Sequence, residues 1–200
     1  MSKSVLVLTA HPDDETLWCG GLLLSNQDWE KTIFSFTRKS DRDRCPKFFR
    51  AVKEYGANGI IDDLDDGVSQ KPLNYSLYKN SILNNLKKKD YDLIITHSIF
   101  GEYSSHLRHE EVSLATLILI YDEIIKTKEL WFFNYTDDKK KNDPYSREDS
   151  DLLLSLSDEV FDKKKRILLD VYGFSKDSWE AKIIPKREGF KIKKTFFMKG

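Results

Sequence analysis

Short runs of aliphatic and β-branched residues alternate along this 200-residue chain with segments of helical periodicity. The clearest runs are residues 4–9 (SVLVLT) and 90–96 (DYDLIIT), whose composition is typical of strands buried inside a parallel sheet. Residues 43–55 instead show the apolar spacing of a helix, at Phe48, Ala51, Val52 and Tyr55. Strands that alternate with helices predict an α/β fold of three layers with a mostly parallel sheet.

The other elements follow the same alternation. We expect helices over 16–25, 75–88, 110–125 and 158–171, and strands over 31–36, 60–61, 129–135 and 193–198. The charged segment 137–151 contains Pro144 and predicts a loop. Because no repeat or low-complexity linker interrupts the series, we expect a single domain spanning residues 1–200.

The composition excludes several classes of protein. Lys and Arg total 33 and Asp and Glu total 33, so no net positive field would attract nucleic acid, and we expect no nucleic-acid partner. The two cysteines, Cys19 and Cys45, form no C-x-x-C pair of a zinc ribbon or redox site. No apolar stretch approaches the ~18 residues of a membrane span, and the first apolar run is too short for a signal peptide. These features predict a cytoplasmic protein and leave its oligomeric state open.

Two polar segments follow the two clearest strands. Residues 10–16 (AHPDDET) come directly after the first strand, and residues 97–109 come directly after strand 90–96. Ligands of open α/β sheets bind outside the carboxyl ends of the strands, where these segments would meet. The four histidines of the chain all lie in the two segments: His11, His97, His106 and His109. We therefore expect a functional site at this edge of the sheet.

The residue types in the two segments are those of a metal site. His11 and Asp14 are three residues apart in a turn that Pro12 stiffens, and His106 and His109 are three apart at the start of a predicted helix. Two imidazoles and one carboxylate are a typical ligand set for zinc that leaves one position open. An alternative remains in which the acidic turn only caps a helix and the histidine pair is exposed.

A family resemblance extends this interpretation. The motif His11-Pro-Asp-Asp-Glu15, after Ala10 and before Gly20-Gly21, resembles the A-H-P-D-D-E-x4-G-G opening of the PIG-L / LmbE-like metal-dependent N-deacetylases. The segment His106-Leu-Arg-His109 resembles the downstream H-x-x-H of that family. The resemblance spans roughly residues 3–135 and implies a Rossmann-like, LmbE-like form of the three-layer fold.

The resemblance also implies a mechanism. Zinc would be bound by His11, Asp14 and His109, and the same ligand types accept Fe²⁺. Asp13 would act as general base, and His106 would support the oxyanion and the leaving group. The implied reaction removes the acetyl group from an N-acetylglucosamine-type sugar on a larger carrier. It gives a free amine and acetate, as in surface-polysaccharide or glycoconjugate biosynthesis.

Substrate contacts are expected from four further residues, Arg44, Asp66, Tyr103 and Arg108. The chain departs from the family pattern at two places nearby. Leu107-Arg108 stands where the family often has Pro-Asp, so another residue must orient His106. Ser104 stands where some relatives have a tyrosine, and Tyr103 precedes it.

Two other functions fit the same residues. One is another metal-dependent amidase or esterase on the same scaffold, which only a panel of substrates would separate from the deacetylase. The other is a non-catalytic α/β binding module, which would bind no metal. The chain contains no G-x-G-x-x-G or Walker motif that would favour a nucleotide-binding module.

Overall fold

A mixed sheet forms the centre of the molecule. The computed structural model describes residues 2–69, 71–103, 105–138 and 143–194, and within them seven strands pair in the order β3-β2-β1-β4-β5-β9-β8. The strands are β1 (Ser4–Thr9), β2 (Glu30–Ser35), β3 (Ala57–Ile61), β4 (Asp90–Thr96), β5 (Lys126–Phe133), β8 (Leu152–Ser155) and β9 (Arg187–Lys194). The first five are parallel to one another, and β9 pairs antiparallel with both β5 and β8. The predicted mostly parallel sheet is confirmed.

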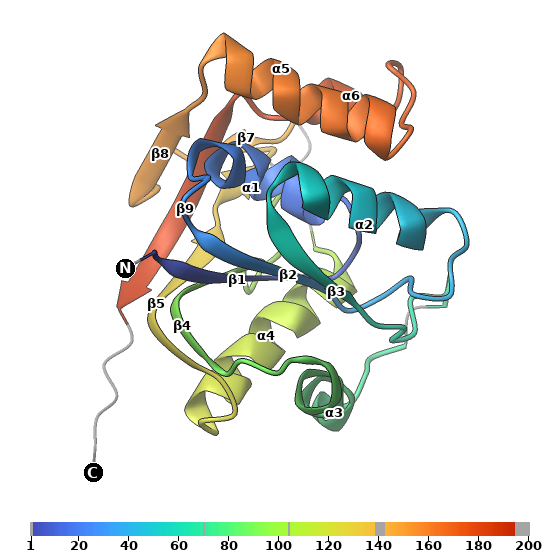
Figure 1. Ribbon diagram of the computed structural model, residues 1–200, viewed down its shortest axis with the longest axis vertical. Coiled ribbons are helices and arrows are strands. Elements are labelled where there is room, and N and C mark those ends of the chain that lie inside the picture. Colours follow the sequence, from blue (N-terminus) through green and yellow to red (C-terminus); the bar gives the residue numbers. More distant parts are fainter. Residues whose placement is uncertain (1, 70, 104, 139–142, 195–200) are drawn as a thin grey trace.

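Helices cover both faces of this sheet (Figure 1). They are α1 (Asp14–Ser25), α2 (Arg44–Glu54), α3 (Tyr75–Asn85), α4 (Leu107–Tyr121), α5 (Asp158–Arg166) with a π-helical extension (Ile167–Val171), and α6 (Trp179–Ile183). Val5 and Val7 of β1 pack into the core under α1, α2, α5 and α6, whereas Leu6 and Leu8 pack into the core under α3 and α4. Because alternate side chains of β1 enter two cores, the strand is apolar throughout and the fold has three layers.

Several short elements differ from the sequence-based expectation. The predicted loop 137–151 contains β7 (Tyr145–Ser146), which pairs with β6 (Tyr135–Thr136). The strands of this pair have two residues each, and β8 and α6 have only four and five. Elements this short show no periodic pattern from which they could be predicted. The predicted strand 193–198 overlaps β9 only at 193–194, and its remainder lies outside the described residues.

The order of the strands reverses beside β1. After β1 the chain adds β2 and β3 on one side, and it then returns to place β4 on the other side. At such a switch point the loops that follow the two strands diverge and leave a crevice. The Ala10 N–H, just after β1, donates to His97 Nε2, just after β4, at 2.9 Å. The fold thus joins the two polar segments as predicted.

The Gly20-Gly21 pair serves the packing of α1. This helix is buried along nearly its whole length. A Cβ atom on Gly21 would lie 2.9 Å from Leu156 Cγ and closer still to the Leu156 methyl carbons. Side chains of ordinary size would therefore separate α1 from the segment between β8 and α5.

Gly21→Ala is expected to lower the free energy of unfolding by about 1–3 kcal/mol, because the added methyl group overpacks this contact. Urea denaturation of Gly21→Ala, Leu156→Ala and the double variant measures it. The double variant should lose less free energy of unfolding than the two single variants lose together, since Leu156→Ala makes room for the methyl group. Additive effects would contradict the close contact.

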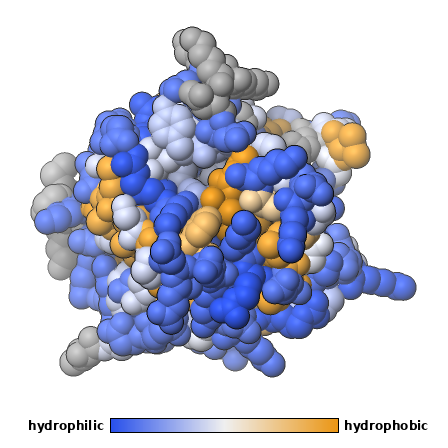
Figure 2. Space-filling model, turned by 90° about the horizontal axis from the view of Figure 1, so that it is seen from above, coloured by the Kyte–Doolittle hydropathy of each residue, from blue (hydrophilic) through white to orange (hydrophobic). Residues whose placement is uncertain are grey.

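Among the helices of the described residues, none is long and apolar enough to cross a bilayer. On the side of α5 and α6 the surface is mostly hydrophilic, and apolar side chains lie in smaller groups between charged ones (Figure 2).

Candidate metal centre

The turn between β1 and α1 has an unusual backbone. Asp13 has φ 108°, a left-handed conformation that a non-glycine residue keeps only under constraint from its surroundings. Glu15 supplies that constraint, since its Oε2 accepts the Asp13 N–H at 3.0 Å and its Oε1 accepts the Tyr172 hydroxyl at 2.6 Å. Asp13 stands at the N-cap position of α1, but its side chain makes no capping hydrogen bond. The alternative in which the Asp13 side chain serves only as a helix cap is wrong.

This backbone turns two consecutive aspartates in different directions. Asp13 Oδ2 lies 2.6 Å from Arg44 Nη1 at the start of α2. Asp14 Oδ2 instead accepts the His11 N–H at 2.8 Å and lies 3.3 Å from His11 Nδ1. The two carboxylates therefore have separate surroundings, which two separate chemical roles require.

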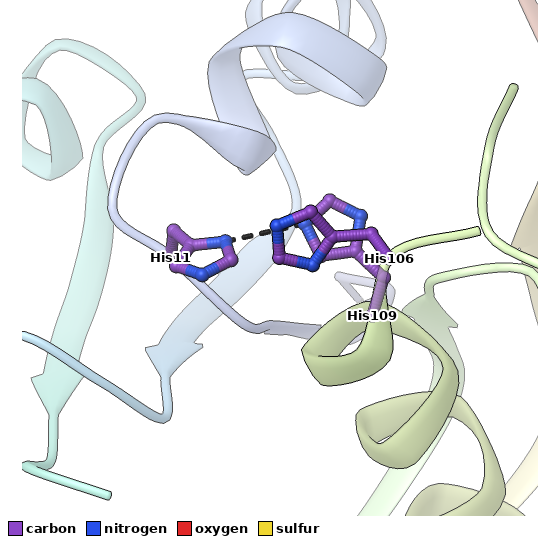
Figure 3. Close-up of side chains that lie close together, drawn as sticks. All are labelled: His11, His106 and His109. Carbon is purple, nitrogen blue, oxygen red and sulfur yellow. Dashed lines mark hydrogen bonds between the residues drawn. The ribbon is translucent and has the colours of Figure 1, made fainter. Parts of the chain in front are cut away.

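Three donor atoms converge from the two polar segments. His11 Nδ1 lies 3.2 Å from His109 Nε2, which in turn lies 3.5 Å from Asp14 Oδ1. Figure 3 shows His11 facing the stacked rings of His106 and His109. Ligands of a tetrahedral zinc ion, at about 2.0–2.2 Å from the metal, are separated by about 3.3–3.6 Å. The nearest donor atoms of His11, Asp14 and His109 therefore lie at about this spacing, with a different Asp14 oxygen facing each histidine.

Hydrogen bonds on the far side of each ring support the same arrangement. His11 Nε2 lies 3.1 Å from Asp66 Oδ1, and His109 Nδ1 lies 2.5 Å from Glu102 Oε2. Each carboxylate accepts an N–H, which leaves the lone pair of the other ring nitrogen directed at the shared centre. A positive charge between the lone pairs of His11, Asp14 and His109 would stabilise this arrangement.

In the metal-free protein a proton can supply that charge. Burial opposes the charged form of His11, yet its hydrogen bonds to Asp14 and Asp66 raise its pKa to about 10. The residues present thus fit a divalent cation, and they bind a proton strongly when none is there.

The described residues offer two overlapping groups of possible metal ligands. One is His11, His106 and His109, and the other is Asp14, His97 and His109. His109 belongs to both groups. His97 Nε2 lies 3.4 Å from Asp14 Oδ2, but its lone pair already accepts the Ala10 N–H. This hydrogen bond disfavours His97 as a metal ligand and favours a role in joining the two polar segments.

His106 stands over the centre at the N-cap position of α4. Its ring stacks on that of His109 with centroids 4.2 Å apart, and Nδ1 is buried without a hydrogen-bond partner among the described residues. Burial and then the positive charges of His109 and His11 lower the pKa of His106 to about 4. His106 is therefore neutral at neutral pH, and a metal in the centre would act in the same direction.

The pKa of the Asp13 carboxyl group suits proton transfer. Burial and the nearby charge of Asp14 raise its pKa to about 8, against the opposing effects of Arg44 and His11. A carboxyl group with a pKa near neutrality can both accept and return a proton at physiological pH.

A cavity of about 620 Å³ opens over these groups. Its wall is polar on one part and aromatic on another. The polar part includes Arg38, Asp41, Arg44 and Asp66, and the aromatic part includes Trp18, Tyr103 and Trp179. The Tyr103 ring lies between the two tryptophans, with centroids 5.7 Å from Trp18 and 5.3 Å from Trp179.

The four predicted substrate contacts have different positions. Arg44 and Tyr103 line the cavity, whereas Asp66 both lines it and holds His11. Arg108 is not among the lining residues. It is fully buried, and its guanidinium donates to the carbonyl oxygens of Asp65 at 2.6 Å and Lys71 at 2.9 Å. Arg108 thus anchors the segment that carries Asp66. Ser104 lies outside the described residues.

Three residues of the site were not predicted from the sequence. Glu102 stands among the histidines of the second polar segment, and an acid at that place was a usable signal. Arg38 holds Asp66 Oδ2 at 2.6 Å, and Trp179 comes from the short helix α6. Neither Arg38 nor Trp179 belongs to a motif that could have identified it.

Fold and site together define a class of protein: an α/β protein with a candidate mononuclear metal centre at the switch point of its sheet. No family model matches the sequence. An uncharacterized protein of Acanthamoeba polyphaga mimivirus is 25% identical in an alignment covering 84% of this chain and 75% of that protein.

Solved structures with the same fold are more informative. The N,N'-diacetylchitobiose deacetylase of Pyrococcus horikoshii matches with a TM-score of 0.71 and 16% identity, over 96% of this chain and 84% of that one. The zinc-inhibited form of a teicoplanin deacetylase matches at 0.61 and 11%, over 84% and 83%. A 4-carboxy-2-hydroxymuconate hydratase of Pseudomonas putida matches at 0.60 and 14%, over 99% of both chains. The predicted LmbE-like fold is thereby confirmed.

Proposed function

We propose that the protein is a metal-dependent N-deacetylase that removes the acetyl group from an N-acetylglucosamine-type sugar on a larger carrier. The observation that carries the proposal is the convergence of three side chains: His11 Nδ1 lies 3.2 Å from His109 Nε2, and Asp14 places Oδ2 3.3 Å from His11 Nδ1 and Oδ1 3.5 Å from His109 Nε2. This convergence lies beside a cavity, on a fold that solved deacetylases of diacetylchitobiose and teicoplanin share.

Zinc is the metal that we propose, with Fe²⁺ as the alternative that the same donors accept. When bound, either metal supplies Lewis-acid polarisation of the amide carbonyl and of the attacking water. His11, Asp14 and His109 would hold it, and the carboxylates of Asp66 and Glu102 would keep the two imidazoles oriented.

Asp13 is the base in this mechanism. It is next to the ligand Asp14 in sequence, but its carboxylate is paired with Arg44 and lines the cavity over the centre. In this position it can take a proton from the attacking water and later return it to the departing amine. Its raised pKa lowers the cost of holding that proton between the two steps.

His106 is the oxyanion donor in this mechanism. As a neutral imidazole it carries one N–H, and it lies on the cavity wall beside the ligand His109. An N–H directed at the oxygen of the tetrahedral intermediate contributes about 3 kcal/mol to a reaction of this kind.

The wall of the cavity suits a sugar ring. The C–H face of a pyranose can pack on the aromatic side chains of Tyr103 and Trp179, while its hydroxyls face the polar side chains. Arg38 and Arg44 are paired with Asp66 and Asp13, so their charges are largely compensated. The cavity therefore favours a neutral sugar over a tricarboxylate such as 4-carboxy-2-hydroxymuconate, although the fold alone permits either reaction.

Trp179→Ala is expected to raise KM for an amino-sugar substrate about tenfold with little change in kcat, because a stacking contact of ~1.4 kcal/mol is lost. Steady-state kinetics measure it, with Trp179→Phe as the control that keeps a stacking ring. Equal KM values for the alanine variant and the wild type would remove Trp179 from the sugar site.

The direct test of the proposed function is acetate release by protein loaded with Zn²⁺ or Fe²⁺. The panel includes N-acetylglucosamine, N,N'-diacetylchitobiose, an acetylated non-sugar amide and an acetate ester, with metal-free protein as the control. We expect acetate and free amine from the sugars only when metal is bound. Hydrolysis confined to the non-sugar compounds would favour the other amidase or esterase function. Metal-loaded protein that hydrolyses none of them would contradict the proposal.

A further inference from the structure

One buried carboxylate joins two histidines behind the proposed metal centre. Glu102 Oε1 lies 2.6 Å from His97 Nδ1, and Glu102 Oε2 lies 2.5 Å from His109 Nδ1. The two imidazole rings stack with their centroids 4.0 Å apart and their planes 24° apart. Glu102 is only 2% exposed, so water does not compete for these hydrogen bonds.

In each ring, the role of Nε2 determines whether the nitrogen that faces Glu102 carries the ring proton. His97 Nε2 accepts the Ala10 N–H at 2.9 Å, so the ring proton of His97 is on Nδ1. His109 Nε2 faces His11 Nδ1 at 3.2 Å and must present a lone pair to bind a metal. Both rings therefore need their proton on Nδ1, and both Nδ1–H groups point at Glu102.

A carboxylate is the side-chain group that satisfies both donors at once. The buried Glu102 side chain presents one oxygen to each ring, the arrangement that two Nδ1–H donors require.

We propose that Glu102 is a positioning residue that sets the tautomer of both histidines. Through His109 it directs a metal-binding nitrogen at the centre. Through His97 it provides the acceptor for the Ala10 amide, at the start of the turn that carries His11 and Asp14. The proposal rests on the metal centre of the proposed function, but it does not depend on the substrate.

Glu102→Gln tests this role because it changes the hydrogen-bonding pattern and almost nothing in size. The amide offers one oxygen and one NH₂ group, so it can accept from only one of the two rings. The other ring then faces a donor and must move its proton to Nε2. For His109 this removes the lone pair that binds metal, and for His97 it removes the acceptor of the Ala10 amide.

The experiment measures zinc affinity by competition with a chromophoric chelator for the wild type, Glu102→Gln and Glu110→Gln. Glu110 is adjacent to His109 in sequence, but its carboxylate accepts from Ser105 Oγ and contacts no imidazole. The control therefore loses the same charge near the same ligand. We expect Glu102→Gln to bind zinc about 10–100-fold more weakly. Glu110→Gln should stay within about threefold of the wild type, because its half-buried carboxylate bonds Ser105 and no ligand. Equal affinities of all three proteins would overturn the proposal.

Imidazole ¹⁵N resonances of the zinc-loaded wild type provide a test that needs no variant to fold. We expect His97 and His109 both to be Nδ1–H tautomers, and one of them to change in Glu102→Gln. An Nε2–H tautomer at either ring of the wild type would refute the role of Glu102.

Neither readout involves a substrate, so a failure of the deacetylase assay leaves this inference standing. A wild-type protein that binds no zinc would overturn both the metal centre and the role of Glu102.

Discussion

Asp13→Asn is expected to lower kcat about 10²–10⁴-fold while the protein keeps its full metal content. Asparagine has nearly the same size, and its amide oxygen can still accept from Arg44, so the turn should be preserved. It cannot take a proton from the attacking water. The donors of the metal centre are unchanged, because Asp14 and not Asp13 faces His11 and His109.

Acetate release and metal content must be measured on the same samples of this variant. Glu180→Gln is a matched control, since Glu180 is another carboxylate that lines the cavity. We expect the control to retain most of its activity. An Asp13→Asn protein that is fully active would exclude Asp13 as the base. Loss of metal together with activity would instead make Asp13 part of the ligand set.

His109→Ala is expected to remove the metal and, with it, the activity. The wild type should contain about one zinc per chain and this variant almost none, because a mononuclear catalytic site has only three protein ligands. His109 is also the one residue that both possible donor groups of the described residues share. The measurement is metal stoichiometry by mass spectrometry after loading and gel filtration.

His106→Ala is the control for this second prediction. It removes an adjacent, stacked imidazole that we assign to the oxyanion, so it should keep its metal and lose activity. Stoichiometric zinc in His109→Ala would place the metal elsewhere. A wild type that accepts neither zinc nor Fe²⁺ would favour the non-catalytic binding module.

The sequence by itself determined the parallel α/β core and the place of the site. Strands 4–9 and 90–96 contain the unbroken apolar runs 5–8 and 93–95 because these residues are buried on two faces, and this is a local property of the chain. The position of a polar segment directly after a strand is also local. Because parallel strands end at one edge, these two facts were enough to bring His11 and His109 together.

Only the tertiary structure decided what each polar side chain of the site contacts. Asp66 was expected to bind a substrate and is also the support of His11, while Arg108 is buried against a loop outside the cavity. Glu102 bridges two histidines that lie five residues before it and seven after it. Such hydrogen bonds depend on the direction of side chains in three dimensions, which sequence spacing does not encode. The helix that carries Trp179 has five residues, which are too few to show a periodic pattern. Tertiary packing and not local propensity stabilises a helix of that length, so the sequence did not predict it.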